Sequence, residues 1–112
     1  MPEGFRPGEM VWADIAFRRE GRVEVKRRPA LVLEPVVEGV RVAWGTRTER
    51  DRPHVCVRAA ERAGIAWQLT SDTWFYGDTQ TVAPEGLRKI VPPPTGRLAD
   101  PRVAVEIRAL AT

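Results

Sequence analysis

The fold class is set by two segments, Met10-Val11-Trp12-Ala13-Asp14-Ile15-Ala16-Phe17 and Pro29-Ala30-Leu31-Val32-Leu33. In the first segment every second residue from Val11 to Phe17 is apolar, which predicts a strand with one face in a core. The second segment is a continuous apolar run, typical of a strand buried on both faces. Gly21 lies in the charged stretch between them and favours a hairpin turn. Together they predict a β-hairpin near the start of a β-rich domain.

Further strands are predicted along most of the remaining chain. They are expected at residues 40–44, 54–57, 65–69, 73–76, 79–83 and 87–91, with a loop or one helical turn at 58–64. The prolines at 92–94 exclude a central strand there. Asp100 and Pro101 suit a helix N-cap and first helical position, and Val103, Ile107 and Leu110 follow at helical spacing. We expect an all-β-dominated fold, a small barrel with a C-terminal α-helix.

The size and composition of the chain narrow its class. With 112 residues, it is expected to form a single domain (1–112) whose core needs neither disulfides nor a metal. One cysteine, Cys56, and one histidine, His54, exclude an internal disulfide and a Cys-rich or His-rich metal site. Neither phosphate-binding glycine motif is present, so we expect no cofactor. No apolar run suits a signal peptide or a membrane span, so we expect a cytoplasmic protein that does not enter membranes.

Positive charge is concentrated in one window. The whole chain carries 18 Lys and Arg against 15 Asp and Glu, a net charge of +3. Residues 18–28 alone hold six cations and two anions, a net charge of +4. Most cations in the chain are arginines, whose planar guanidinium fits phosphate. The window predicts a polyanion partner such as RNA, although a general preference for arginine in the composition is an alternative explanation.

Few side chains suggest catalysis by themselves. His54 has no second histidine with which to share acid and base work, so we interpret it as structural or exposed. Cys56 lies between two valines and is interpreted as a buried, inert thiol. There remain Arg28, at the head of a buried strand, and Thr46, at the end of the strand at 40–44. A guanidinium and a hydroxyl at the rim of a β core are suited to binding a phosphate.

Four segments in this order resemble the MazF/PemK/Kid family of toxin endoribonucleases. Residues 7–14 read PGEMVWAD, similar to the family's opening strand P-G-D-(I/V)-V-W-V-D. Residues 26–33 read KRRPALVL, similar to (K/R)-R-P-(A/V)-L-V-(L/I). Thr46 stands where the family has (I/L)-T-(S/G), and residues 96–98 with the following helix are similar to its G-x-L and C-terminal helix. The four segments span nearly the whole chain, and the first two together are fairly specific.

The resemblance implies an SH3-like barrel with a C-terminal α-helix, forming a homodimer with an RNA groove along the subunit boundary. It implies the toxin of a type II toxin–antitoxin system, an mRNA interferase that inhibits growth. Such an enzyme cleaves single-stranded RNA without a metal, through attack of the substrate's 2′-hydroxyl on phosphorus. The products carry 2′,3′-cyclic phosphate and 5′-hydroxyl ends. The expected partners are single-stranded RNA and a cognate antitoxin protein whose disordered tail competes with RNA.

The resemblance also assigns roles to individual residues. Arg28 matches the catalytic arginine, which would stabilise the phosphorane, and Thr46 the catalytic threonine, which would orient the phosphate. Asp78, in Tyr76-Gly77-Asp78, matches the carboxylate of an Arg-x-Asp pair with Tyr76 in place of the arginine; a turn residue is the alternative. The family's RNA-covering loop matches residues 18–27. The expected RNA-binding residues are Arg18, Arg19, Arg22, Lys26, Arg27 and Arg47.

A non-catalytic function stays open at this point. The third-strand motif reads Gly45-Thr46-Arg47, without the Ser or Gly that the family has after Thr. A degenerate PemK-like binding module, or a toxin that binds gyrase as CcdB does, is therefore the alternative. The aromatic segment at 73–76 is interpreted as core or dimer interface, with base stacking as its alternative.

Overall fold

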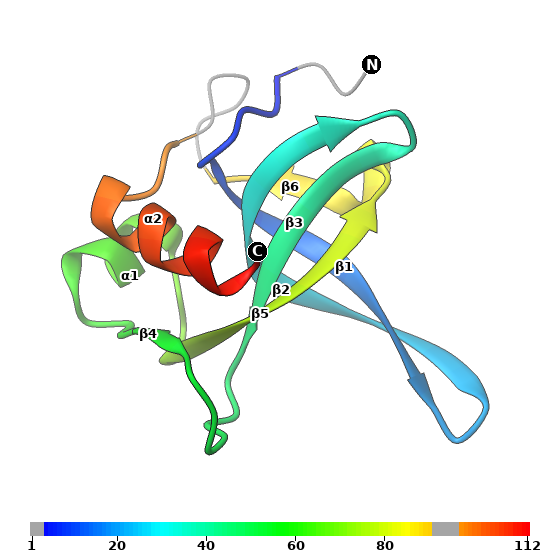
Figure 1. The fold of residues 1–112 in the computed structure, drawn as a ribbon, viewed down its shortest axis with the longest axis horizontal. Coiled ribbons are helices and arrows are strands. Elements are labelled where there is room, and N and C mark those ends of the chain that lie inside the picture. The colour runs from blue at the N-terminus through cyan, green and yellow to red at the C-terminus, as the bar shows by residue number, and fades with distance from the viewer. Residues whose placement is uncertain (1–3, 91–96) are drawn as a thin grey trace.

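The computed structural model describes residues 4–90 and 97–112, and its elements are shown in Figure 1. They are β1 (Met10–Arg19), β2 (Arg22–Val36), β3 (Gly39–Thr46), β4 (Val55–Val57), α1 (Arg62–Trp67), β5 (Thr73–Val82), the 3₁₀ turn η1 (Pro84–Gly86), β6 (Leu87–Lys89) and α2 (Pro101–Leu110). The strands form one antiparallel sheet in the order β4-β5-β3-β2-β1-β6. Within the described residues no ladder joins β4 to β6, so the sheet is not closed. The expected all-β-dominated fold with a C-terminal helix is confirmed.

A long hairpin of β1 and β2 replaces the expected loop at residues 18–27. The two strands pair continuously from Met10 opposite Leu31 to Arg19 opposite Arg22. The turn between them is Glu20-Gly21, with φ of 51° and 76°, the positive values that a two-residue hairpin turn requires. The turn is thus tighter than expected, and residues 18 and 19 and 22–27 are strand. In Figure 1 this hairpin extends well beyond the rest of the sheet.

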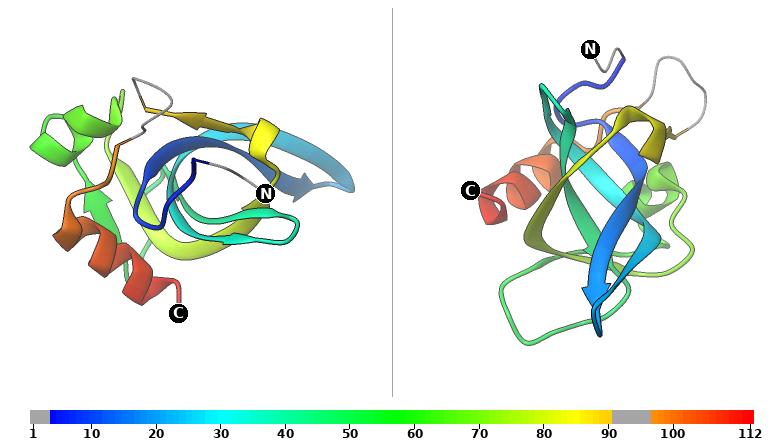
Figure 2. Two further views of the ribbon diagram at one scale, coloured as in Figure 1. Left: turned by 90° about the horizontal axis from the view of Figure 1, so that it is seen from above. Right: turned by 90° about the vertical axis from the view of Figure 1, so that its right-hand side faces the viewer.

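The two faces of the curled sheet pack into two separate cores. The concave core contains Val11, Ala13, Ile15, Ala30, Val32, Val40, Val42, Val82 and Leu87. The outer core contains Met10, Leu31, Leu33, Ala43, Val57, Trp67, Phe75, Ile90, Ala99 and Ile107. Both helices lie on the outer side of the sheet (Figure 2). Successive residues of one strand alternate between the two cores. The position of a residue along its strand therefore decides whether its side chain points to the concave face or the outer face.

A side-chain amide connects β5 to β1 where no strand ladder does. Gln80 Oε1 accepts a hydrogen bond of 2.8 Å from the Ala16 backbone N–H, and Gln80 Nε2 donates one of 3.0 Å to the Ala16 carbonyl. The amide therefore satisfies the outward backbone groups of Ala16 as a neighbouring strand would. This contact brings two strands that are far apart in the ladder order into direct contact.

The strand expected at residues 65–69 is wrong, because α1 covers Arg62–Trp67. The chain turns Trp67 completely into the outer core, where its ring stacks on Phe75 with centroids 5.3 Å apart. Ala63 and Ala66 also pack against that core, whereas Ile65 is 65% exposed. The buried positions are thus spaced as on a helix, and the short apolar run did not distinguish helix from strand.

The remaining elements differ from expectation mainly at their ends. The two strands expected at 73–76 and 79–83 are one strand, β5, which bulges opposite Trp44 at Gly77, where φ is 90°. Only Gly fits there, because a Cβ would lie 2.2 Å from the Leu110 carbonyl oxygen of α2. The start of α2 is as expected, with the Asp100 side chain accepting from Arg102 N at 2.9 Å. Val91, the prolines at 92–94 and Gly96 lie outside the described residues.

Candidate functional site

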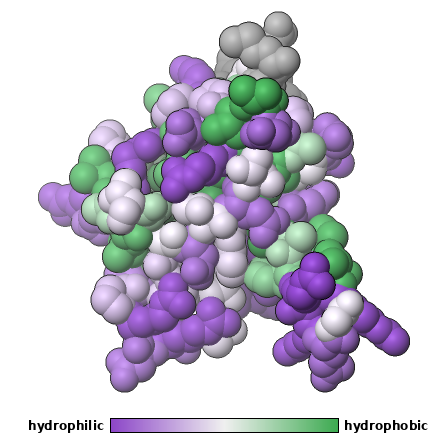
Figure 3. Space-filling model, turned by 45° about the vertical axis from the view of Figure 1, so that its right-hand side comes forward, coloured by the Kyte–Doolittle hydropathy of each residue, from purple (hydrophilic) through white to green (hydrophobic). Residues whose placement is uncertain are grey.

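The largest concentration of sequence-predicted site residues lines one pocket. This arginine pocket has a volume of about 300 Å³ and is lined by Phe17, Arg18, Arg19, Glu24, Lys26, Arg28, Trp44, Thr46, Thr48 and Arg50. It lies where the concave face of the sheet continues past its buried core into the β1–β2 hairpin. In Figure 1 the hairpin and residues 47–54 extend from the same end of the sheet, and Figure 3 shows two mainly hydrophilic projections with a hollow between them.

Arg28 is held at the inner end of the arginine pocket by β2, opposite the buried Ala13 of β1. Its guanidinium carbon lies 5.8 Å from the centroid of the Phe17 ring, and its Nε is buried without a hydrogen-bond partner. Burial lowers the pKa of the Arg28 guanidinium, and the positive charges of Arg47 and Arg50 lower that pKa further. An anion bound here would supply the missing acceptor and relieve the repulsion.

Thr46 ends β3 opposite Trp74 of β5, and it is 5% exposed. Its Oγ1 accepts a hydrogen bond of 3.3 Å from the Thr48 backbone N–H. The hydroxyl proton is then available to a ligand, since a hydroxyl donates as well as accepts. The structure therefore brings Arg28 and Thr46, which are 18 residues apart in the sequence, to one pocket.

The structure distributes the six expected RNA-binding side chains over different surfaces. Arg18, Arg19 and Lys26 line the arginine pocket, together with Arg28. Arg22 is exposed at the tip of the hairpin and lines none of the pockets described. Arg27 points to the other face of the hairpin, where its Nε lies 3.1 Å from Asp14 Oδ1. Arg47 directly follows β3 and lines a second pocket.

Five residues of the arginine pocket were missed by sequence reasoning. They are Phe17, Glu24, Trp44, Thr48 and Arg50. Phe17 and Trp44 form an edge-to-face aromatic pair, with centroids 5.0 Å apart and planes at 87°. The available signal for the two aromatic residues was the apolar residue at every second position. This pattern places Phe17 and Trp44 on the strand faces that form the concave core. Glu24 supplies the carboxylate among the residues lining this pocket.

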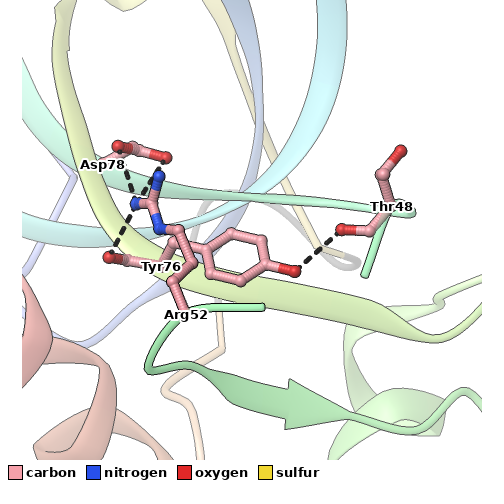
Figure 4. A network of polar contacts seen from close by, with 4 residues as sticks. All are labelled: Thr48, Arg52, Tyr76 and Asp78. Carbon is pink, nitrogen blue, oxygen red and sulfur yellow. Dashed lines mark hydrogen bonds and ion pairs between the residues drawn. The ribbon is translucent and has the colours of Figure 1, made fainter. Parts of the chain in front are cut away.

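Asp78 does not line the arginine pocket. Asp78 Oδ1 accepts a hydrogen bond of 3.3 Å from Arg52 Nη2, and the same Nη2 donates to the Tyr76 carbonyl at 3.3 Å (Figure 4). The Tyr76 hydroxyl donates to the Thr48 carbonyl at 2.9 Å and accepts from the Arg50 backbone N–H. This network fastens residues 47–54 to β5. Asp78 thus supports the segment that carries Arg50, and its match to a catalytic carboxylate remains a prediction.

The other residues singled out in the sequence lie away from the arginine pocket. His54 is exposed, with its Nδ1 2.9 Å from the Arg52 carbonyl oxygen, as expected for a structural or exposed histidine. Cys56 is half-buried on β4, and burial raises the pKa of its thiol. In the aromatic segment Phe75 and Tyr76 are buried, which confirms their place in the core.

A smaller pocket lies on the opposite side of Arg28. This tryptophan pocket has a volume of about 130 Å³ and is lined by Trp12, Arg27, Arg28, Pro29, Arg47, Leu69, Thr70, Ser71 and Thr73. The β2–β3 ladder begins at Ala30 opposite Trp44, so the two strands separate just before the position of Arg28. Arg28 lines both pockets because it stands at this separation.

Comparison with known proteins gives no relative: no protein-family model matches the chain, and no curated protein matches it. Across residues 4–90 and 97–112, no cluster of three or more His, Cys, Asp or Glu is placed to hold a metal ion. Over the same residues, neither helix has the length and apolar character needed to cross a membrane.

Proposed function

We propose that this protein is a metal-independent endoribonuclease of the toxin type, acting on single-stranded RNA at the arginine pocket. The observation that carries the proposal is the environment of Arg28. Its buried Nε has no acceptor, and its neighbours Arg47 and Arg50 add positive charge without an ion pair in the described residues. Such a cluster favours a bound phosphate strongly, and the hydroxyl of Thr46 lines the same pocket.

The chemistry follows from what these groups can donate and accept. The substrate's 2′-oxygen attacks the adjacent phosphorus and loses its proton. The bond from phosphorus to the 5′-oxygen breaks, and that oxygen takes up a proton from water. Arg28 donates to the equatorial oxygens, whose negative charge grows in the phosphorane, and so stabilises the transition state more than the ground state. Thr46 donates a hydrogen bond from its hydroxyl to the same phosphate and so fixes the orientation of that phosphate. Glu24 is the carboxylate of the pocket and is our candidate acceptor for the 2′-hydroxyl proton.

The hairpin supplies a path for the rest of the RNA. Arg18, Arg19 and Lys26 extend from Arg28 toward the hairpin tip and would neutralise successive phosphates. Phe17 and Trp44 form the apolar part of the same pocket, where an unpaired base can stack. The alternation of aromatic and basic side chains suits a single strand, whose bases are free to stack.

We also propose that the curled sheet is an SH3-like barrel, with the Gln80–Ala16 contact between β5 and β1 acting as its closure. A homodimer and a cognate antitoxin belong to the same proposal. An acidic antitoxin tail would compete with RNA for the basic hairpin, because both carry negative charge. A ternary complex that still cleaves RNA would contradict this competition.

The decisive experiment is cleavage of single-stranded RNA in excess EDTA. We expect cleavage that persists without metal and leaves 2′,3′-cyclic phosphate and 5′-hydroxyl ends. An RNA with a single 2′-deoxy nucleotide at the cleaved position should resist, because the nucleophile is missing. Arg28→Ala purified in parallel should cleave about 10²–10³-fold more slowly. Arg102→Ala, an exposed arginine on α2, should match the wild type and so exclude a contaminating nuclease. The proposal would be refuted if cleavage required added metal, or if the wild type cleaved no RNA.

A further inference from the structure

The tryptophan pocket adjoins the arginine pocket through a shared side chain. Arg28 lines both, and Arg47, one of the two arginines that lower the Arg28 pKa, lines the tryptophan pocket. A phosphate bound at Arg28 would therefore have the arginine pocket on one side and the tryptophan pocket on the other. In a single-stranded nucleic acid, the groups on either side of a phosphate are two nucleosides.

The walls of the tryptophan pocket suit a flat, partly apolar group. Trp12 is half-buried and held in place by its Nε1, which donates to the Trp67 carbonyl at 3.3 Å. Pro29 and Leu69 complete the apolar lining. Aromatic and apolar walls of this kind bind unstacked bases in RNA-binding proteins. The volume of about 130 Å³ leaves room for one such ring system and not for a folded partner.

The polar groups of the tryptophan pocket are unequally occupied. Arg27 is engaged by Asp14, and the Thr73 hydroxyl donates to the Ser71 carbonyl at 3.2 Å. By contrast, the guanidinium of Arg47 and the hydroxyls of Thr70 and Ser71 make no hydrogen bond within the described residues. Besides Arg28, the free groups are therefore one guanidinium and two hydroxyls, placed around an apolar wall.

We propose that the tryptophan pocket binds one unpaired nucleobase next to the phosphate held by Arg28, and that guanine is its preferred base. This inference rests on the proposed function, because it assigns a sequence preference to the same RNA site. Guanine presents two neighbouring acceptors, O6 and N7, and an arginine fork binds them in two parallel hydrogen bonds. Arg28 is assigned to the phosphate and Arg27 is paired with Asp14, so Arg47 is the arginine of the pocket that is available to the base. The Thr70 and Ser71 hydroxyls serve the remaining edge of the base.

The test measures binding apart from cleavage. Short 2′-O-methyl oligouridines in which one central nucleotide is G, A, C or U cannot be cleaved through a 2′-hydroxyl. We expect the wild type to bind the G-containing oligonucleotide about 10-fold more tightly than the others. Arg47→Ala and the double variant Thr70→Ala/Ser71→Ala should each lose most of that preference. Arg102→Ala removes an exposed charge that lines neither pocket, and this variant should keep the preference.

Each outcome separates this inference from the proposed function. Equal binding of all four oligonucleotides, or none, overturns the base pocket, whereas cleavage of RNA in EDTA decides the nuclease independently. A G preference that survives unchanged in both pocket variants also overturns it. A preference for another base that disappears in both variants overturns the assignment of guanine. Loss of the preference in Arg47→Ala with unchanged circular dichroism and unfolding midpoint supports the pocket.

Discussion

The guanidinium carbon of Arg28 lies 5.8 Å from the centre of the Phe17 ring, across the β1–β2 hairpin. The ring holds the cation in place without neutralising it, since a cation–π contact leaves every N–H free to donate. With Nε buried and unpaired, the guanidinium is fixed at the end of the arginine pocket before any ligand arrives. A donor that is already oriented needs little reorganisation when charge develops on a phosphate.

The first prediction is that Arg28→Lys fails as a substitute for arginine. Lysine keeps the charge but loses the planar fork that bonds two phosphate oxygens. We expect turnover to fall about 10²–10³-fold in Arg28→Ala, the usual loss of one oxyanion donor, and to remain strongly impaired in Arg28→Lys. Single-turnover cleavage in EDTA measures both. Wild-type cleavage by Arg28→Lys would mean that Arg28 only contributes to the basic field.

Thr46 offers a test of the hydroxyl alone. Thr46→Val keeps the shape of a side chain that is 5% exposed but removes the donor, whereas Thr46→Ser keeps it. A hydrogen bond to a charged group contributes about 1.5–3 kcal/mol, so we expect Thr46→Val to cleave roughly 10- to 150-fold more slowly. Thr46→Ser should retain most activity. Equal impairment of both variants, with unchanged folding, would assign Thr46 a packing role instead.

The hairpin makes a prediction about the two faces of one strand. Lys26 lines the arginine pocket, whereas its neighbour Arg27 is paired with Asp14 on the other face. Lys26→Ala should reduce the slope of log affinity for RNA against log salt by about one phosphate-equivalent. Arg27→Ala should change this slope much less. Fluorescence anisotropy with an uncleavable RNA at several salt concentrations measures it, and identical slopes for the two variants would contradict the assignment of faces.

The sequence was sufficient for the strands that alternate or stay apolar, and for Asp100 and Pro101 at the start of α2. It could not reveal the helix at Arg62–Trp67, because burial of Trp67 against Phe75 depends on a strand that comes later in the chain. The same limit applied to the site. Arg28 and Thr46 were predicted from the sequence and line one pocket. Arg50 was not predicted, because its position depends on the Tyr76 hydroxyl, a contact between distant segments.

Gln80 predicts how strongly the β5–β1 contact stabilises the fold. Its amide makes two hydrogen bonds to the Ala16 backbone, each of which contributes about 0.5–1.5 kcal/mol. We expect Gln80→Ala to lower the free energy of unfolding by about 1–3 kcal/mol, because the Ala16 groups then rely on water. Thr81→Ala, an exposed neighbour on β5, is the control. Urea denaturation measures both, and equal stability of the two variants would exclude a closing role for Gln80.

Asp72 predicts an acid-dependent part of the stability. The Ala59 backbone N–H at 2.9 Å, and then Arg58 Nη1 at 3.0 Å, lower the pKa of this carboxyl below its ordinary value. A lowered folded-state pKa adds stability that is fully present above the unfolded pKa of about 4 and is lost as the pH falls through the folded value. Asp72→Asn keeps a neutral acceptor and removes the charge. We therefore expect this variant to be less stable than the wild type at pH 7, with the difference shrinking below about pH 4.

Asp51→Asn is the control. It removes a charge that makes no ion pair in the described residues, so its difference from the wild type should change little over the same range. Thermal unfolding of the three proteins from pH 7 to pH 3 measures this, and a pH-independent deficit in Asp72→Asn would show that the hydrogen bonds act without the charge.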